Sequence, residues 1–384
     1  MAPPAARPRR SSLAAAASGA SPRAAAEAKP DAKPRAADAK PSAPALPSLD
    51  ELRAAIPPEC FESNVPLSLL YLFGYGAVLA SAALTYPLLA GSAAGLALYA
   101  AFYGTFMWAM FVIGHDAGHG TFSRSPLLNG IVGHVAHAPL LVPFYPWALS
   151  HHHHHLHHNH VTNDFSHFWL TPEARKGMNA LSEAFADSNL VLLLMTPIHF
   201  ALYLFPGLPD GSHVVPWGYL WERTRASRAD RARCVLSTLA VAACAAAIYR
   251  LGLGWAYFAP WFVYNSWLFV VTYMQHHGAG TRVFTDGTWG FVRGGLETVD
   301  RVMGWGLDPV TLYITSDHLV HHLFFRSIPH YHLRRATEGL RKSLEAKGAL
   351  ALHQRVDYAS PLHYLGHFVQ TMLHGGFTDF QLVV

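Results

Sequence analysis

Two long apolar segments constrain this sequence more than any other feature. They run from Pro66 to about Ala90 and from Ser92 to about Gly114, and neither contains Asp, Glu, Lys or Arg. Each segment is long enough to cross roughly 30 Å of hydrocarbon as an α-helix. The two segments therefore predict one transmembrane helical hairpin.

A second apolar pair predicts a second hairpin further along the chain. We expect its helices at Val235 to about Phe258 and at Ala259 to about Gln275, with Arg250 and its neighbouring glycines at the turn. A basic cluster precedes this pair and marks that flank as cytoplasmic or stromal under the positive-inside rule. The cluster comprises Arg223, Arg225, Arg228, Arg231 and Arg233.

Two other apolar segments are less regular. They are Pro126 to Leu149 and Leu190 to Phe205, and the second is interrupted by Pro197 and His199. A single crossing by the second segment would move the following elements to the opposite face of the membrane. We therefore expect both segments to be interfacial or re-entrant. The prediction is four spans, with both termini and every histidine cluster on one face.

The N-terminal segment differs in composition from the rest of the chain. Residues 1–46 consist mainly of Ala, Pro, Ser, Arg and Lys, which cannot bury a core. We expect a disordered segment, either a solvated tail or an organelle transit peptide. Residues 47–384 should form one domain. A capping-box pattern at Ser48 and Glu51 predicts a short first helix that Pro57 and Pro58 end.

Composition and charge argue against several other classes of protein. Charged residues make up 14% of the chain, against roughly a quarter in soluble globular proteins. The 28 basic and 24 acidic residues give a net charge of +4 with no basic stripe, which argues against nucleic-acid binding. Cys60, Cys234 and Cys244 are odd in number and form no CxxC pair, so we expect buried thiols rather than disulfides or a thiolate zinc site.

Histidine is the outlier, because its 26 copies outnumber the 24 carboxylates. Three clusters have the i, i+3 or i, i+4 spacing that places side chains on one helix face. Each cluster follows or precedes an apolar segment on the same predicted face of the membrane. With the histidine that ends the fourth predicted span, they supply nine imidazoles: His115 and His119; His151, His154 and His155; His276; and His318, His321 and His322.

This constellation predicts a metal site, since imidazole is a good ligand for Fe, Zn, Cu and Ni. The apolar spans imply a lipid-like substrate, and breaking an unactivated C–H bond requires a redox cofactor. Iron with dioxygen can supply this chemistry, whereas zinc has no redox chemistry. A metal transporter is the rival from another class, but it would place Asp or Glu inside the spans, and the four predicted spans contain neither.

At these residues the sequence resembles the membrane fatty acid desaturases, specifically the methyl-end (omega-3) acyl-lipid group. The likeness runs from about Leu49 to about Thr337 and includes the HxxxH, HxxHH and HxxHH boxes, GHDAGHGTFS at 114–123, and PHYHL at 329–333. Two departures stand out. HxxHH also fits His154, His157 and His158, although the flanking residues select the register that begins at His151. Phe325 and Arg326 replace the residues that usually follow the third box.

The resemblance implies an all-α integral membrane fold of four transmembrane helices in two hairpins, with a cytosolic or stromal His-rich helical cap that holds two non-haem iron ions. It implies that the nine histidines above are the ligands. It also implies an unsaturated acyl lipid substrate, O2, and electrons from a separate donor, cytochrome b5 or ferredoxin. The membrane is that of the endoplasmic reticulum or of a plastid. An omega-6/delta-12 desaturase and a di-iron hydroxylase or ketolase are the alternatives.

Other residues near the boxes receive weaker assignments. The carboxylates next to them either orient ligand imidazoles or serve as helix caps and surface groups. The aromatic segment from Trp255 to Phe262 either lines an apolar substrate tunnel or forms an interfacial aromatic belt. The carboxylates are Asp116, Asp164 and Asp317, and the additional histidines expected to support the site are His158, His160, His330 and His332.

Overall fold

The computed structural model describes residues 46–384 apart from 165, 168, 177, 179, 209, 210 and 279. The chain divides into two units, 1–43 and 44–384, and the expectation for the N-terminal segment lies almost entirely outside the described residues. The first helix, α1 (Leu49–Ala54), confirms the capping box. The backbone N–H of Glu51 donates to Ser48 Oγ at 3.2 Å, and Glu51 Oε2 accepts from the backbone N–H of Ser48 at 2.8 Å.

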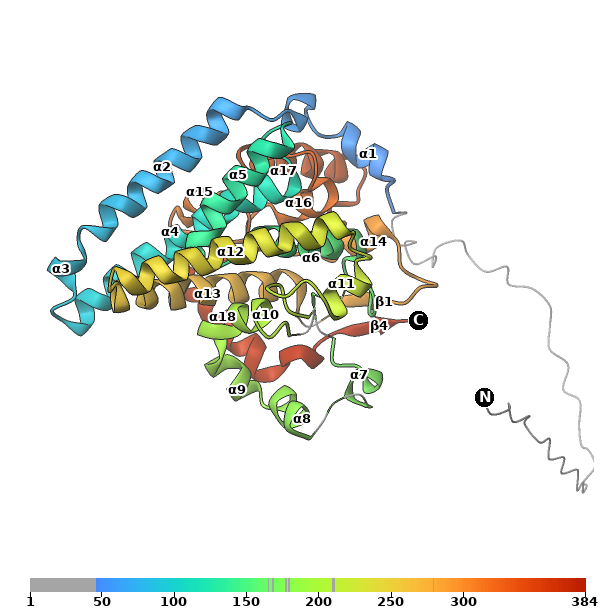
Figure 1. The fold of residues 1–384 in the computed structure, drawn as a ribbon. Helices are drawn as coiled ribbons and strands as arrows, with labels where there is room; N and C mark the ends of the chain where they lie inside the picture. The colour runs from blue at the N-terminus through green and yellow to red at the C-terminus, as the bar shows by residue number, and fades with distance from the viewer. Residues whose placement is uncertain are drawn as a thin grey trace, which may run out of the picture. The chain divides into compact units, whose positions relative to one another are not determined.

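The first predicted hairpin consists of α2 (Val65–Ala83), the short α3 (Tyr86–Leu89) and α4 (Ala93–His119) (Figure 1). The side chains of Asn64 and Ser92 cap α2 and α4. Helix α4 continues beyond the apolar segment to His119, and Gly120, whose φ of +79° is unfavourable for residues with a side chain, caps its end. Its last turns carry His115 and His119 beyond the apolar stretch.

The second hairpin consists of α12 (Arg228–Arg250) and α13 (Gly254–His276). The expected turn at Arg250 is confirmed, but the expected boundary between Phe258 and Ala259 is wrong, because Gly252 and Gly254 form the turn with positive φ. Figure 1 shows the turns of both hairpins at the same end of the bundle. The hydroxyl of Tyr99 on α4 donates to the backbone carbonyl of Ala256 at that end, at 2.9 Å.

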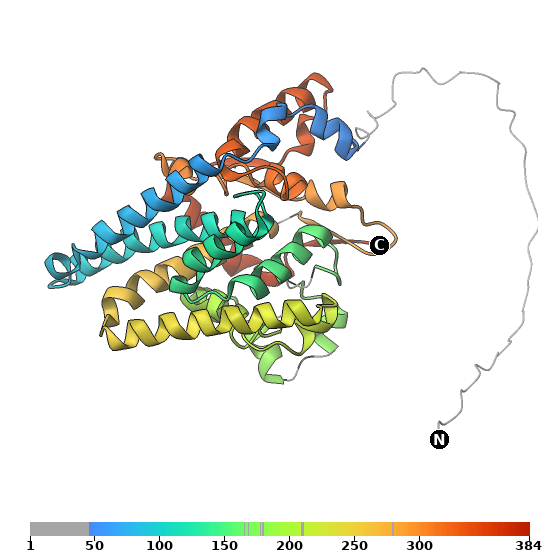
Figure 2. The ribbon, with the colours of Figure 1, turned by 45° about the horizontal axis from the view of Figure 1, so that its top comes forward.

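Three of the described helices are long and apolar enough to cross a membrane, namely α2, α4 and α12. The predicted fourth span, α13, has the length but not the composition, since it contains Pro260, Asn265 and Gln275. The reason is its position: α13 packs along α4 and is buried among its neighbours, so much of it contacts protein (Figure 2). At Gly104 of α4 an added Cβ would lie 2.5 Å from the carbonyl oxygen of Pro260, so glycine permits this close approach.

The two irregular apolar segments form broken helices. The first consists of α5 (Pro126–His137), the 3-10 turn η2 (Ala138–Leu140) and α6 (Phe144–His157), and its two halves meet at 102°. The second consists of α9 (Asn189–Leu194), η3 (Thr196–Ile198) and α10 (His199–Leu204). Neither α9 nor α10 is long enough to span a membrane. The sharp bend of the first segment fits a re-entrant path or a broken span.

The remaining elements surround the rest of the bundle: Figure 1 shows α11 and α14 at the end opposite the hairpin turns, and α8 and α18 along its lower side. They are mostly short helices: η1 (Pro58–Phe61), α7 (Pro172–Lys176), α8 (Ala180–Asp187), α11 (Tyr219–Arg223), α14 (Phe291–Gly295), α15 (Leu307–Val310), α16 (His318–Phe324), α17 (His330–Ala346), η4 (Leu350–Leu352), α18 (Pro361–His374) and η5 (Gly376–Thr378).

The prediction of a wholly helical fold requires a small correction. Strand β1 (Arg282–Phe284) pairs in parallel with β4 (Gln381–Val383), and β2 (Asp300–Val302) pairs in parallel with β3 (Arg355–Asp357). Each strand has three residues, too few to show a twofold pattern of hydrophobicity in the sequence. These strands form because tertiary packing brings distant segments of the cap together.

Candidate metal centre

Five of the predicted histidines converge in one group, which we call cluster A: His115, His119, His151, His155 and His321. One ring nitrogen from each lies within 4.8 Å of those of the others. The Nε2 atoms of His115 and His119 are 3.2 Å apart, and Nε2 of His155 is 3.1 Å from Nε2 of both His151 and His321. Three helices, α4, α6 and α16, thus supply one group of imidazoles.

Aromatic packing orients the rings of cluster A. The indole of Trp147, one helical turn before His151, stacks on that imidazole with ring centroids 4.7 Å apart. Phe325 stacks on His155 with centroids 4.6 Å apart and an interplanar angle of 19°. Phe325 is one of the two residues that depart from the family pattern. Its ring therefore packs directly against cluster A.

The other four predicted histidines, His154, His276, His318 and His322, gather in an adjacent group, which we call cluster B together with His158 and His167. Nε2 of His318 and Nε2 of His322 are 3.1 Å apart. The ring centroids of His154 and His276 are separated by 4.9 Å. The rings of His155 and His322 have centroids 4.2 Å apart, which places the two clusters side by side.

Partners outside the clusters hold several imidazoles through Nδ1. His154 donates from Nδ1 to Oδ1 of Asp164 at 2.7 Å, and Asp164 also accepts from the backbone N–H of Asn159 at 3.0 Å. Nδ1 of His318 donates to the carbonyl oxygen of Ile314 at 2.9 Å. Such contacts fix the tautomer that directs Nε2 toward a metal. Asp164 thus has the orienting contact that was one of the two interpretations of its sequence position.

The other two carboxylates near the boxes behave differently. Asp116 accepts from Nδ1 of His330 at 2.8 Å and lies 3.6 Å from Nδ1 of His115, so it links cluster A to the start of α17. Asp317 accepts from the hydroxyl of Ser316 at 2.6 Å and, among the described residues, makes no hydrogen bond or ion pair with a cluster imidazole. Its side chain does not cap α16 either, so neither expected role is observed for Asp317.

Burial governs the protonation of the histidines on α16. Loss of hydration and neighbouring imidazoles hold the pKa values of His318, His321 and His322 well below the usual range. Their rings are therefore neutral at physiological pH and keep a lone pair available for a metal. Nε2 of His155 faces Nε2 of both His151 and His321 at 3.1 Å, and the single N–H or lone pair at that atom can make a normal hydrogen bond with only one of them. The clusters fit a metal site with nitrogen ligands, as iron accepts.

The structure separates the histidines of the second box. His151, His154 and His155 face the two clusters, whereas His157 stacks on His153 with centroids 4.1 Å apart. His158 was expected only to support the site, and its Nε2 lies 2.8 Å from Nδ1 of His276.

Sequence reasoning missed His167 altogether. One of its ring nitrogens groups with those of His154 and His276. Its signal was weak, a lone histidine three residues beyond Asp164 and outside any helical repeat.

The remaining histidines expected to support the site lie outside the two clusters. Nε2 of His160 contacts the exposed carboxylate of Asp286 at 2.9 Å. His332 is partly exposed at the start of α17, where its ring lies beside that of Tyr331 with centroids 4.8 Å apart.

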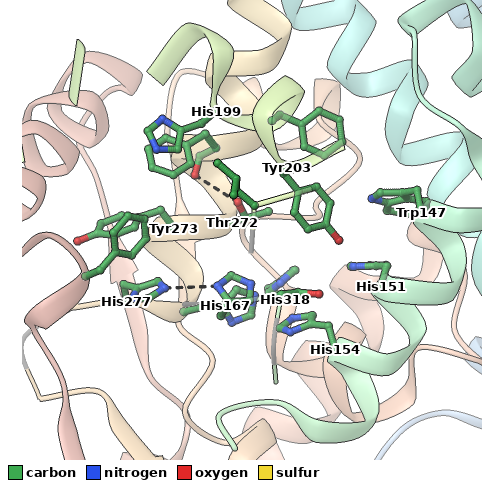
Figure 3. Close-up of a pocket in the computed structure, with 16 residues that line it drawn as sticks. Trp147, His151, His154, His167, His199, Tyr203, Thr272, Tyr273, His277 and His318 are labelled. Carbon is green, nitrogen blue, oxygen red and sulfur yellow. Dashed lines mark hydrogen bonds between the residues drawn. The ribbon is translucent and has the colours of Figure 1, made fainter. Parts of the chain in front are cut away.

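An apolar cavity of about 170 Å³ adjoins cluster B (Figure 3). In Figure 3 the rings of His154, His167 and His318 lie on one side of the cavity, and Trp147, Tyr203 and Thr272 lie around it. The remaining lining residues are His151, Ser166, His199, Phe200, Leu208, Phe269, Tyr273, His276, His277 and Phe377.

The expectation that residues 255–262 line such a tunnel is wrong for this cavity, since none of its lining residues comes from that segment. Those residues start α13 at the hairpin turns, whereas the cavity lies at the other end of the helix. The hydroxyl of Tyr257 instead donates to the carbonyl oxygen of Pro139 at 2.8 Å.

Comparisons with known proteins agree with this arrangement. A family model described as fatty acid desaturase matches residues 91–355. The Delta(12) fatty acid desaturase fat-2 of Caenorhabditis elegans is 38% identical over 311 residues, with 79% of this chain and 81% of the relative aligned. The omega-3 fatty acid desaturase fat-1 of the same species is 36% identical, with 78% and 74% aligned.

A plant relative extends the comparison. The temperature-sensitive sn-2 acyl-lipid omega-3 desaturase (ferredoxin), chloroplastic, of Arabidopsis thaliana is 34% identical, with 88% of this chain and 77% of the relative aligned. The family model covers more than half of the chain, and the relatives align along most of it. The chain therefore belongs to the fatty acid desaturase family, whose members are oxidoreductases that act on acyl lipids.

Proposed function

We propose that this protein is a methyl-end, omega-3 desaturase that converts two adjacent methylenes of an unsaturated acyl chain into a cis double bond. The balanced reaction consumes one O2, two electrons and two protons, removes two hydrogens from the acyl chain, and releases two water molecules. The observation that carries the proposal is the pair of adjacent imidazole clusters beside an apolar cavity. No side-chain acid or base in that cavity could break an unactivated C–H bond.

The omega-3 position is supported by the sequence around the boxes and by several omega-3 relatives. GHDAGHG at 114–120 and PHYHL at 329–333 resemble the omega-3 group more than the omega-6 group. The Delta(12) desaturase of Caenorhabditis elegans is also similar to this chain, so a delta-12 desaturase is the second candidate. The two candidates share the metal centre and differ in where the acyl chain is placed.

We propose that two iron ions occupy the clusters, one in each. Iron would supply activation of O2 and removal of hydrogen from carbon, chemistry that amino-acid side chains lack. The proposed ligands are the nine histidines identified from the sequence, five in cluster A and four in cluster B. They are His115, His119, His151, His155 and His321 in cluster A, and His154, His276, His318 and His322 in cluster B.

The surrounding residues would keep these imidazoles in place. Asp164 holds His154 through Nδ1, and the carbonyl oxygen of Ile314 holds His318. His158 contacts Nδ1 of His276 and would leave Nε2 of that ring for the metal. Each of these contacts removes a tautomer that could not bind a metal through Nε2.

The acyl chain would enter the apolar cavity next to cluster B, where Phe200, Phe269 and Phe377 exclude water. Tyr203 is anchored there, since its hydroxyl lies 2.7 Å from Oγ of Ser150, a residue of the helix that carries the second box. This link would keep the cavity wall in register with the histidines. The aromatic wall therefore has the position needed to set which methylenes face the metals.

The electron donor is proposed to be a separate protein, cytochrome b5 or ferredoxin. The protein is proposed to be a multi-pass membrane protein of the endoplasmic reticulum or a plastid, since relatives with both locations are similar to it.

Expression in yeast tests the reaction and its position together. Cells that produce the full chain would be supplied separately with linoleate and arachidonate, and double-bond positions would be determined by mass spectrometry. We expect new omega-3 products. Conversion of oleate to linoleate in unsupplied cells would support the delta-12 candidate, and hydroxylated products would overturn desaturation. A His154→Ala variant should form no product, and a variant that keeps near-full turnover would overturn the ligand assignment.

A further inference from the structure

His167 lies inside cluster B, although no histidine box contains it. The centroid of its ring is 4.3 Å from that of His276 and 4.6 Å from that of His154. One nitrogen from each of these three rings lies within 4.8 Å of the other two. His167 comes from the segment between α6 and α7, whereas all other histidines of cluster B lie on α6, on α13, on α16 or directly after α6.

The second nitrogen of His167 is engaged in the same way as that of His154, His276 and His318. Nδ1 of His167 lies 3.4 Å from Nε2 of His277, as the dashed line in Figure 3 marks. His277 is itself held by Tyr273, whose ring stacks on it with centroids 4.8 Å apart at 5°. Metal-binding histidines characteristically use their other ring nitrogen in this manner.

The numbers of imidazoles in the two clusters point in the same direction. Cluster A contains five rings from the histidine boxes, whereas cluster B contains four rings from the boxes and α13. His158 contacts His276 through Nδ1 of that ring, so it acts on a ligand rather than as one. His167 is therefore the ring available to complete a fifth position in cluster B.

We propose that His167 is a tenth histidine ligand, which binds the metal of cluster B through Nε2. The inference rests on the proposed iron occupancy of the two clusters and extends it. His167 lines the apolar cavity, so its ring closes the side of the metal site that faces the acyl chain (Figure 3). The ligand on the cavity side of cluster B then comes from a loop, whereas the other proposed ligands come from helices.

The test is ⁵⁷Fe Mössbauer spectroscopy of the purified full-length protein, together with iron content during titration with a chelator. His167→Ala removes the imidazole, and His167→Gln keeps a hydrogen-bonding group toward His277. The matched control is His153→Ala, because His153 lies on the second-box helix but stacks on His157 outside both clusters. Added imidazole provides a rescue for the alanine variant.

In both His167 variants we expect the quadrupole splitting of one of the two irons to change, with the other iron unaffected. We expect that iron to be lost at a roughly 10-fold to 100-fold lower chelator concentration. Added imidazole should restore the spectrum of His167→Ala, and His153→Ala should match the unmodified protein. If His167→Ala does not elute as a folded species, the His167→Gln spectrum decides the question.

Two contrary results have different meanings. If the unmodified protein binds two irons and forms product, and both His167 variants give its spectrum and chelator sensitivity, His167 is not a ligand and the proposed function stands. If the unmodified protein binds no iron and forms no product, the proposed function falls, and the assignment of His167 falls with it.

Discussion

Replacement of Asp164 by Asn should weaken metal binding at cluster B without removing any proposed ligand. Asp164 is 1% exposed and accepts two hydrogen bonds, from Nδ1 of His154 at 2.7 Å and from the backbone N–H of Asn159 at 3.0 Å. An Asn side chain has only one acceptor oxygen, so it can accept from one of these two donors, and its NH2 group then faces the other donor. With the NH2 group facing His154, the favoured tautomer carries its proton on Nε2, where the metal lone pair is needed.

The magnitude follows from the loss of this orienting contact. Loss of such an outer partner typically costs about 10-fold to 100-fold in metal affinity. This corresponds to about 1.4 to 2.8 kcal/mol at 1.4 kcal/mol per tenfold. The range agrees with about 1.5 to 3 kcal/mol for a hydrogen bond to a charged group. We therefore expect half of the bound iron to be released at a chelator concentration one to two orders of magnitude lower than in the unmodified protein.

The assay is iron retention against a chelator series, measured on purified protein and compared with product formation in yeast. The matched control is Asp286→Asn, because Asp286 also contacts a histidine, His160 at 2.9 Å, but its side chain is 91% exposed and lies outside both clusters. That variant should retain iron like the unmodified protein. Equal iron retention in the Asp164 and Asp286 variants would refute the argument that Asp164 fixes the tautomer of His154.

Three further predictions test packing, the cavity and proton linkage. Gly104→Leu should lower the thermal unfolding temperature in detergent by several degrees, because the new Cβ meets the backbone of α13. The control Gly76→Ala, with no neighbour closer than 4.0 Å, should leave that temperature unchanged. Equal unfolding temperatures for the two variants would contradict the close approach of α4 and α13. Thr272→Phe should fill part of the cavity beside cluster B and so reduce conversion of longer acyl chains relative to shorter ones. The control Trp255→Phe lies outside the cavity and should leave the chain-length profile of the products unchanged. The pKa values of the three histidines on α16 are lowered from 6.5, so below that pH the unfolded chain binds more protons than the folded chain. The metal-free protein should therefore lose stability as pH falls from 7.5 to 5.5, by up to about 1.4 kcal/mol per pH unit for each ring. A pH-independent unfolding temperature would contradict this linkage.

The departure at Phe325 illustrates how a variation in sequence acquires a physical meaning. In the sequence Phe325 stands out only as a departure from the residues that usually follow the third box. In the structure its ring stacks on His155 and lies 5.2 Å from His119, so it shields two rings of cluster A from solvent. This position is separate from the cavity beside cluster B. Phe325 is therefore better placed to affect the surroundings of cluster A than the lining of the cavity.

The histidine boxes could be identified from the sequence because their spacing is local. His151, His154 and His155 share one face of α6 through helical periodicity alone, and the same holds for His318, His321 and His322 on α16. The long apolar runs likewise determined α2, α4 and α12 as candidate spans, since a long apolar helix is most stable in hydrocarbon. The capping box at Ser48 and the turn at Arg250 are equally local.

Tertiary structure decided which rings meet and where the cavity lies. The division into clusters A and B depends on how α4, α6, α13 and α16 converge, and no spacing within one helix contains that information. His167 reaches cluster B from an irregular segment, so no periodicity marks it. The polar residues of α13 and the three-residue strands likewise depend on partners distant in the chain. Local patterns therefore determined the helices and the histidine boxes, whereas contacts between distant segments determined which imidazoles come together and where the apolar cavity lies.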